Sequence, residues 1–173
     1  VYDIIPITYP QYCHENTTFF FMNYLGAFLQ YADIIIVSAE STLRQINKLT
    51  ERLGLKRKKI YVSWLGADFT AKSNQGEYVE KEVKNIVKQG RYILCIGTIE
   101  PRKNHKLLLD AYDEKLADMG INMVFAGKIG WNVEELHQRI LKHPKYGKGL
   151  YHLKGLNDAS IDYLYRNAYV VAF

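Results

Sequence analysis

The fold is decided by one stretch of the sequence, Leu94-Cys95-Ile96-Gly97-Thr98-Ile99-Glu100-Pro101-Arg102-Lys103-Asn104-His105. It joins an apolar strand, residues 92–96, through a glycine to a short polar turn that carries two adjacent cations. Apolar residues at helical spacing follow at Leu107, Leu108, Ala111, Tyr112 and Leu116. Backbone N–H groups and the dipole at a helix start favour an anion, and Arg102 and Lys103 add charge. The stretch therefore predicts a strand, a turn and a helix that could hold the diphosphate of a nucleotide.

The same alternation continues through the second half of the chain. The pattern predicts strands over 92–96, 122–126, 150–153 and 169–173. Helices are predicted over 103–116, over 133–142, and through Ile161, Leu164 and Ala168 with Asn157 as the cap. Strands that alternate with helices imply a parallel sheet with right-handed crossovers, so the predicted fold class is α/β.

The first half of the chain has a similar order of elements. Asp3 to Ile7 is predicted to end a buried strand, and Thr17 or Thr18 to cap a helix that runs to Tyr31. The β-branched run 33–37 is typical of a strand covered on both faces. A helix with apolar positions Leu43, Ile46, Leu49 and Leu53, stopped by Gly54, and a strand over 59–65 follow.

The character of the sequence changes between residues 70 and 90. Residues 72–76 are polar and turn-prone, and an exposed helix is predicted over 78–88. We expect a domain boundary in this segment, because composition shifts of this kind mark linkers.

Composition excludes several classes of protein. The chain of 173 residues is 48% hydrophobic and 24% charged, as in ordinary globular proteins. The most apolar region, residues 19–39, is interrupted by Asn23, Gln30 and Asp33, so it is a poor membrane span.

Net charge is +5, with a basic run over 56–59 that indicates a solvated helix end or attraction to anionic lipid. Aromatic residues do not interleave with this run, which argues against nucleic-acid binding. The two distant cysteines indicate reduced thiols and a cytoplasmic location.

The run strand-G-T-I-E-P-R-K-N-H-x-x-L-L-x-A closely resembles the donor-site motif of the GT-B glycosyltransferases of family 4, the "glycosyl transferases group 1" family. It is most similar to the bacterial mannosyltransferase-type members. An ordinary βα turn with two solvated basic residues is the alternative. Further segments carry the likeness: residues 3–10, 32–38, 62–68, the loop Gly127-Lys128-Ile129-Gly130-Trp131, and residues 152–168.

The resemblance implies parts of two Rossmann-like domains. Residues 1–69 are similar to the last part of an amino-terminal, acceptor-side domain, 70–90 to the interdomain segment, and 91–173 to the first half of the domain that binds the nucleotide sugar. The paired glutamates of the family would follow residue 173, and its glycine-rich loop and histidine would precede residue 1. The expectation is a fragment that lacks both ends, holds no catalytic residue and is inactive alone.

The resemblance also assigns site residues. Lys103, Arg102, Gly97 and Thr98 correspond to the diphosphate site, although some members place an arginine where this chain has Thr98. Gly155, Leu156 and Asp158 correspond to the nucleoside site, and Lys128 and Trp131 would border the cleft. Each assignment has a structural alternative: Arg102 could pair with Glu100, Trp131 could be a packing residue, and residues 155–158 could form a plain capped turn. His14, His105 and His152 show no metal-ligand spacing, and the family implies no metal or cofactor.

The activity implied is retaining hexosyl transfer, with mannosyl transfer favoured, in surface polysaccharide (lipopolysaccharide-type) biosynthesis. GDP-mannose is favoured as the donor, with a UDP-sugar as the alternative. The acceptor would be a glycan or a polyprenyl-linked glycan, which places the enzyme in the cytoplasm or at the inner face of the membrane. The rival hypothesis is a non-catalytic nucleotide-binding or assembly module. An oxidoreductase is disfavoured, because no G-x-G-x-x-G with a following acidic residue is present.

Overall fold

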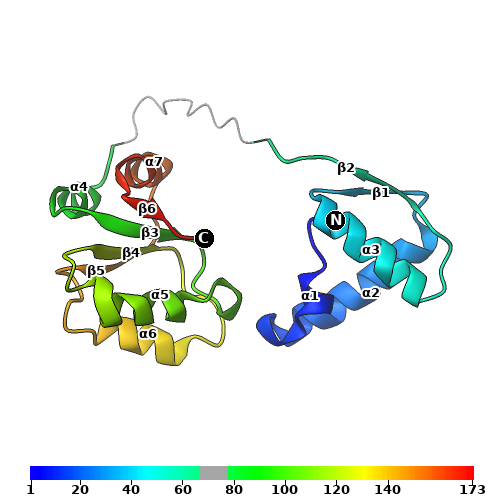
Figure 1. Ribbon diagram of the computed structural model, residues 1–173, viewed down its shortest axis with the longest axis horizontal. Helices are drawn as coiled ribbons and strands as arrows, with labels where there is room; N and C mark the ends of the chain where they lie inside the picture. Colours follow the sequence, from blue (N-terminus) through cyan, green and yellow to red (C-terminus); the bar gives the residue numbers. More distant parts are fainter. Residues whose placement is uncertain (67–77) are drawn as a thin grey trace. The chain divides into compact units, whose positions relative to one another are not determined.

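The computed structural model describes residues 1–66 and 78–173. The chain divides into two compact units, Val1–Thr70 and Ala71–Phe173, and each contains a parallel sheet (Figure 1). The turn predicted at 72–76 lies outside the described residues, as does the first part of the boundary segment expected over 70–90.

The sheet of the second unit has four parallel strands in the order β5-β4-β3-β6. They are β3 (Tyr92–Ile96), β4 (Asn122–Ala126), β5 (Leu150–Leu153) and β6 (Val170–Val171). The first three have the predicted bounds, and β6 is shorter than predicted. β3 and β4 pair over five residues, from Tyr92 opposite Asn122 to Ile96 opposite Ala126. The predicted parallel α/β arrangement is confirmed.

Helices cover both faces of this sheet (Figure 1). α5 (His105–Ala111) and α6 (Glu134–Leu141) lie on one face, and α4 (Lys81–Lys88) and α7 (Asp158–Asn167) on the other. Asn157 caps α7 as predicted, because its side-chain oxygen accepts the N–H of Ser160 at 2.8 Å. Alternate strand residues therefore enter two separate cores.

The helix predicted over 78–88 is present as α4, but the expectation that it is exposed is wrong for one of its faces. In α4 the side chains of Val83 and Ile86 are at most 1% exposed and pack against Leu94 and Leu164. Their spacing of three residues forms an apolar stripe, which the surrounding charged residues obscure in the sequence. α4 is therefore part of the core of the second unit.

The first unit packs two helices against one face of a two-stranded sheet. Its elements are α1 (Ile5–Thr8), the 3₁₀ turn η1 (Pro10–Tyr12), α2 (Glu15–Tyr31), β1 (Ile34–Val37), α3 (Glu40–Arg52) and β2 (Lys59–Val62). β1 and β2 are parallel. The buried core consists of Ile4, Leu25, Leu29, Ile35, Val37 and Ile46.

Three expectations for this unit are wrong. Residues 5–8 form a helix rather than a strand end, because Asp3 accepts the N–H of Ile5 at 2.9 Å and proline suits a first helical turn. His14, not a threonine, caps α2 through Nδ1. β1 is covered on one face among the described residues, since Ile34 and Ile36 are each more than half exposed.

In the described parts of the chain, no helix combines the length and apolarity needed to cross a bilayer.

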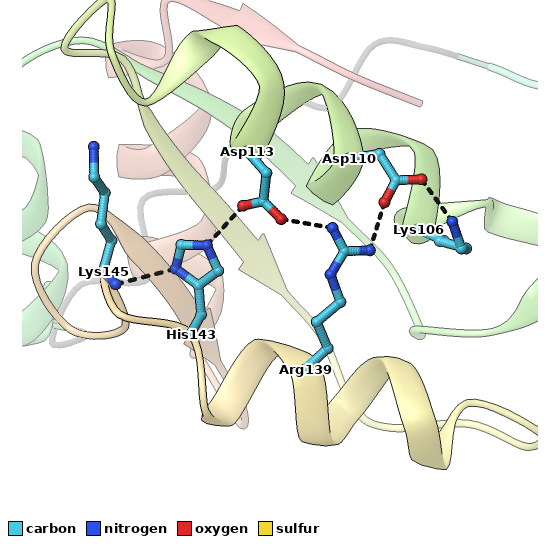
Figure 2. A network of polar contacts seen from close by, with 6 residues as sticks. All are labelled: Lys106, Asp110, Asp113, Arg139, His143 and Lys145. Carbon is cyan, nitrogen blue, oxygen red and sulfur yellow. Dashed lines mark hydrogen bonds and ion pairs between the residues drawn. The ribbon is translucent and has the colours of Figure 1, made fainter.

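An ion-pair network ties α6 to the helix before it (Figure 2). Arg139 of α6 donates to Asp110 of α5 at 2.5 Å and to Asp113 at 2.6 Å. Asp113 lies in η3 (Tyr112–Leu116), a π-helical turn that continues α5, and it also contacts His143 at 2.6 Å. Hydrogen bonds from Lys106 and Arg139 lower the pKa of Asp110. One guanidinium thus links two helices on the same face of the sheet.

Replacing Arg139 should loosen the docking of α6. Because Arg139→Met removes two inter-helix ion pairs, we expect it to lower the Tm by about 5 °C. The matched control is Arg166→Met, which removes one exposed ion pair to Asp162 within α7 and should change the Tm by less than about 2 °C. Thermal unfolding followed by circular dichroism measures both, and equal shifts would refute the inter-helix role.

Candidate functional site

The candidate site lies at the carboxyl edge of the second sheet. The chain adds β4 and then β5 on one side of β3, and afterwards places β6 on the other side of β3. The strand order therefore reverses between β3 and β6. In open parallel sheets, ligands bind beyond the carboxyl ends of the strands at such a reversal.

A cavity of about 230 Å³ opens at this edge. Five of the residues predicted for the site line it: Gly97, Thr98, Lys128, Gly155 and Leu156. The rest of its wall is apolar and comes from Ile96, Ala126, Leu153 and Ile161, together with Gly127. Residues from three separate loops thus meet at one place, as the parallel topology requires.

Two of these loops are held together by backbone hydrogen bonds. The N–H of Gly97 donates to Ala126 at 2.9 Å, and the N–H of Ile99 donates to Lys128 at 2.9 Å. A Cβ on Gly127 would lie 1.9 Å from the carbonyl oxygen of Gly97, so no side chain fits there. Sequence reasoning named the loop that begins at Gly127 and assigned a site role to Lys128 but none to Gly127, although a glycine directly after a buried strand was the available signal.

Lys103 lies beside this edge but does not line the cavity. It ends a 3₁₀ turn, η2 (Pro101–Lys103), and the left-handed residue Asn104 separates it from α5. The prediction that Lys103 begins the helix is therefore wrong. Its Cε lies 4.0 Å from the Cβ that Gly97 lacks, and its Nζ lies 3.5 Å from the ring centroid of Phe173. The ammonium group thus reaches back to the reversal between β3 and β6.

Arg102 is held by a carboxylate. Its guanidinium donates to Glu100 at 2.6 Å, and the side chain of Glu100 is only 5% exposed. This pairing is one of the two alternatives that the sequence left open. The charge of Arg102 is therefore largely balanced within its own loop.

Asp158 and Trp131 do not reach the cavity wall. Asp158 is the first residue of α7, where a carboxylate suits the positive end of the helix dipole. Trp131 is half-buried in the turn before α6. The structure therefore brings five of the nine predicted residues to one cavity and places Lys103 and Arg102 in the adjacent turn. Asp158 and Trp131 do not line the cavity.

Three histidines lie behind the site loops. His105 is 1% exposed, and its Nε2 is 3.5 Å from the sulfur of Cys95. His152 lies 2.9 Å from the carbonyl oxygen of Gly127 through Nε2, and the ring of His137 packs edge-on against it. Within the described residues no group of three or more His, Cys, Asp or Glu side chains is arranged to hold a metal ion.

Burial disfavours the charged form of two of these imidazoles, those of His105 and His152. Desolvation, the charge of Lys103 and His152 together lower the pKa of His105 to about 4. Burial also lowers the pKa of His152, and it raises the pKa of the Cys95 thiol. In the sequence, His105 and His152 show no metal-ligand spacing and were given no other role. Their burial follows from the tertiary fold, so the sequence alone does not reveal it.

A larger cavity, of about 520 Å³, lies near the first turns of α5 and α6. Its wall includes the cations Lys106 and Arg139, and both are already paired with Asp110. Its wall also includes Glu134 and Glu135, which would repel an anion. The smaller cavity is therefore the better candidate for a nucleotide diphosphate.

Stability of the second unit should fall in mild acid. The folded pKa of His105 lies below its unfolded value, so the unfolded chain binds more protons and stability is lost between about pH 6.5 and about pH 4. We expect the wild type to lose roughly 2 kcal/mol more than His105→Gln between pH 7 and pH 5. Urea unfolding followed by Trp131 fluorescence in a Trp64→Phe background measures this, and identical pH profiles would contradict it.

Gly127→Ala should destabilise the second unit by roughly 3 kcal/mol, because the methyl group would overlap the Gly97 carbonyl and force the two loops apart. Gly26→Ala is the control. Nothing lies within 4 Å of the added methyl group there, and a helix-interior alanine should stabilise the first unit by up to about 1 kcal/mol. Urea titration of each variant tests the contrast, and an unchanged midpoint for Gly127→Ala would disprove the constraint.

Comparisons with known proteins identify relatives of the chain. Residues 78–173 match the family model described as glycosyl transferases group 1. Two sequences of the serotype-specific mannosyltransferase WbdA of Escherichia coli are 25% and 26% identical to the chain over 182 residues. Each alignment covers all of this chain and 22% of the relative, so the chain spans less than a quarter of the relatives' length.

A solved structure shares the fold. It is the crystal structure of the pneumococcal O-GlcNAc transferase GtfA in complex with UDP and GlcNAc, with a TM-score of 0.62 and 16% identity. The match covers 86% of this chain and 27% of that one. Since the family model spans more than half of the sequence and the parallel α/β fold is that of a GT-B enzyme, the chain belongs to the glycosyl transferases group 1 family.

Proposed function

We propose that the second unit binds the nucleotide-sugar donor of a glycosyltransferase at the carboxyl edge of its sheet. The observation that carries this proposal is the meeting of Gly97, Thr98, Lys128, Gly155 and Leu156 around one cavity beside Lys103. The diphosphate would lie beside Lys103, Gly97 and Thr98, and the nucleoside would lie toward Gly155 and Leu156. Arg102, Asp158 and Trp131 would contribute from the margins of the site.

The chemistry of such a site is electrostatic. As the glycosidic bond breaks, negative charge grows on the leaving diphosphate, and a positioned ammonium stabilises it. Lys103 suits this task because a neutral ring, rather than a carboxylate, contacts its ammonium group. The first unit would hold the acceptor.

For the donor we propose a mannosyl nucleotide such as GDP-mannose, transferred with retention to a glycan or polyprenyl-linked glycan. The similarity to WbdA, a mannosyltransferase, supports the sugar. The UDP complex of GtfA keeps a UDP-sugar as the alternative. The enzyme would act in surface polysaccharide synthesis in the cytoplasm, at the inner face of the membrane.

The basic run at residues 56–59 gives this membrane location limited support. Lys58 donates to the carbonyl of Gln30 at the end of α2 at 2.9 Å, so it serves a helix end. Lys56, Arg57 and Lys59 stay exposed and would be available to anionic lipid.

The decisive test titrates the intact protein with GDP, UDP and their sugar conjugates while thermal stabilisation is followed. Lys103→Ala should weaken nucleoside diphosphate binding by about 10- to 100-fold, because it removes a charge-assisted contact. Lys106→Ala is the control. It removes the same charge three residues away, from an exposed side chain paired with Asp110, and should leave the affinity unchanged.

Retained affinity in Lys103→Ala would overturn the site. The rival hypothesis, a non-catalytic nucleotide-binding module, predicts a different pattern. In that case the intact protein would bind nucleoside diphosphates through Lys103 but would transfer sugar from none of the donors to any glycan acceptor.

A further inference from the structure

Phe173 lies at the reversal of strand order described above. β6 pairs with β3 through Val170 and Val171, opposite Ile93 and Leu94. The N–H of Ala172 then donates to the carbonyl of Leu94 at 2.8 Å. The backbone that carries Phe173 is therefore fixed beside the carboxyl half of β3.

The ring of Phe173 contacts the ammonium of Lys103. Nζ lies 3.5 Å from the ring centroid, well within the distance at which a cation and an aromatic face attract each other. The Lys103 stem also passes close to the bare Cα of Gly97. A lysine has a flexible four-carbon stem, so these two neighbours restrict a group that would otherwise sample many positions.

The two cations of this loop are held in different ways. Glu100 binds Arg102 and balances its charge, whereas an aromatic ring orients Lys103 without cancelling its charge. An ammonium held in this manner keeps its full attraction for an incoming anion. The ring of Phe173 is itself 99% exposed, so its contact narrows the range of ammonium positions before the ligand arrives, which reduces the entropy lost on binding.

We propose that Phe173 is a positioning residue that holds the Lys103 ammonium at the β3–β6 reversal for the donor diphosphate. This proposal rests on the donor-binding role proposed for Lys103. Phe173 acts through Lys103 and needs no contact with the reacting atoms.

The test measures binding of GDP and UDP to the intact protein. Phe173→Leu should weaken nucleoside diphosphate binding roughly three- to tenfold, while Phe173→Tyr, which keeps an aromatic face, should restore it. In a Lys103→Ala background, Phe173→Leu should have no further effect. The matched control is Tyr169→Leu, which removes a contact of Arg91 with a ring at 5.2 Å, just before β3 and β6 begin, and should not change the affinity.

The outcomes separate the two proposals. Wild-type affinity in Phe173→Leu, together with a loss in Lys103→Ala, would overturn the role of Phe173 and leave the donor site standing. Equal losses from Phe173→Leu in both backgrounds would mean a general structural effect and would also overturn it. No loss in Lys103→Ala would remove the donor site and this proposal together.

Discussion

The close contact between the loops that follow β3 and β4 is the constraint on which the rest of the second unit depends. Five paired residues bring the two strands to their carboxyl ends in register, and Gly127 then passes Gly97 so closely that a side chain at Gly127 has no room. Because of this contact, the loop that carries Lys128 and the turn that carries Lys103 have fixed positions. Backbone packing therefore sets the positions of the loops that would form a nucleotide site at this edge.

Charge at this edge is distributed unevenly. Burial lowers the pKa of His105 and of His152, and Arg102 is balanced by Glu100. Lys103 differs because its contacts are an aromatic ring and a glycine. The positive potential of the turn is thus concentrated on one ammonium group, which faces the place where the topology expects a ligand.

The sequence was most informative where local pattern and tertiary environment agree. The apolar runs of β3, β4 and β5 have their predicted bounds, because a buried parallel strand needs continuous apolar residues. α4 was misjudged, since two apolar residues among lysines and glutamates reveal a buried face only when α7 packs on them. Lys103 precedes the helix because Asn104 adopts a left-handed conformation, which the residue pattern did not predict. Gly127 is required because the loop after β3 passes against it, and that neighbour is distant in the sequence.

The influence of Lys103 on its buried neighbours works in both directions. Its positive charge contributes to lowering the pKa of His105 and opposes the rise caused by burial in the pKa of Cys95. By reciprocity, an anion that neutralises the ammonium would make the imidazole more basic and the thiol less acidic. Near the pH at which His105 titrates, its imidazole carbon resonances in an NMR spectrum would then report occupancy of the site from inside the protein, without a label on the ligand.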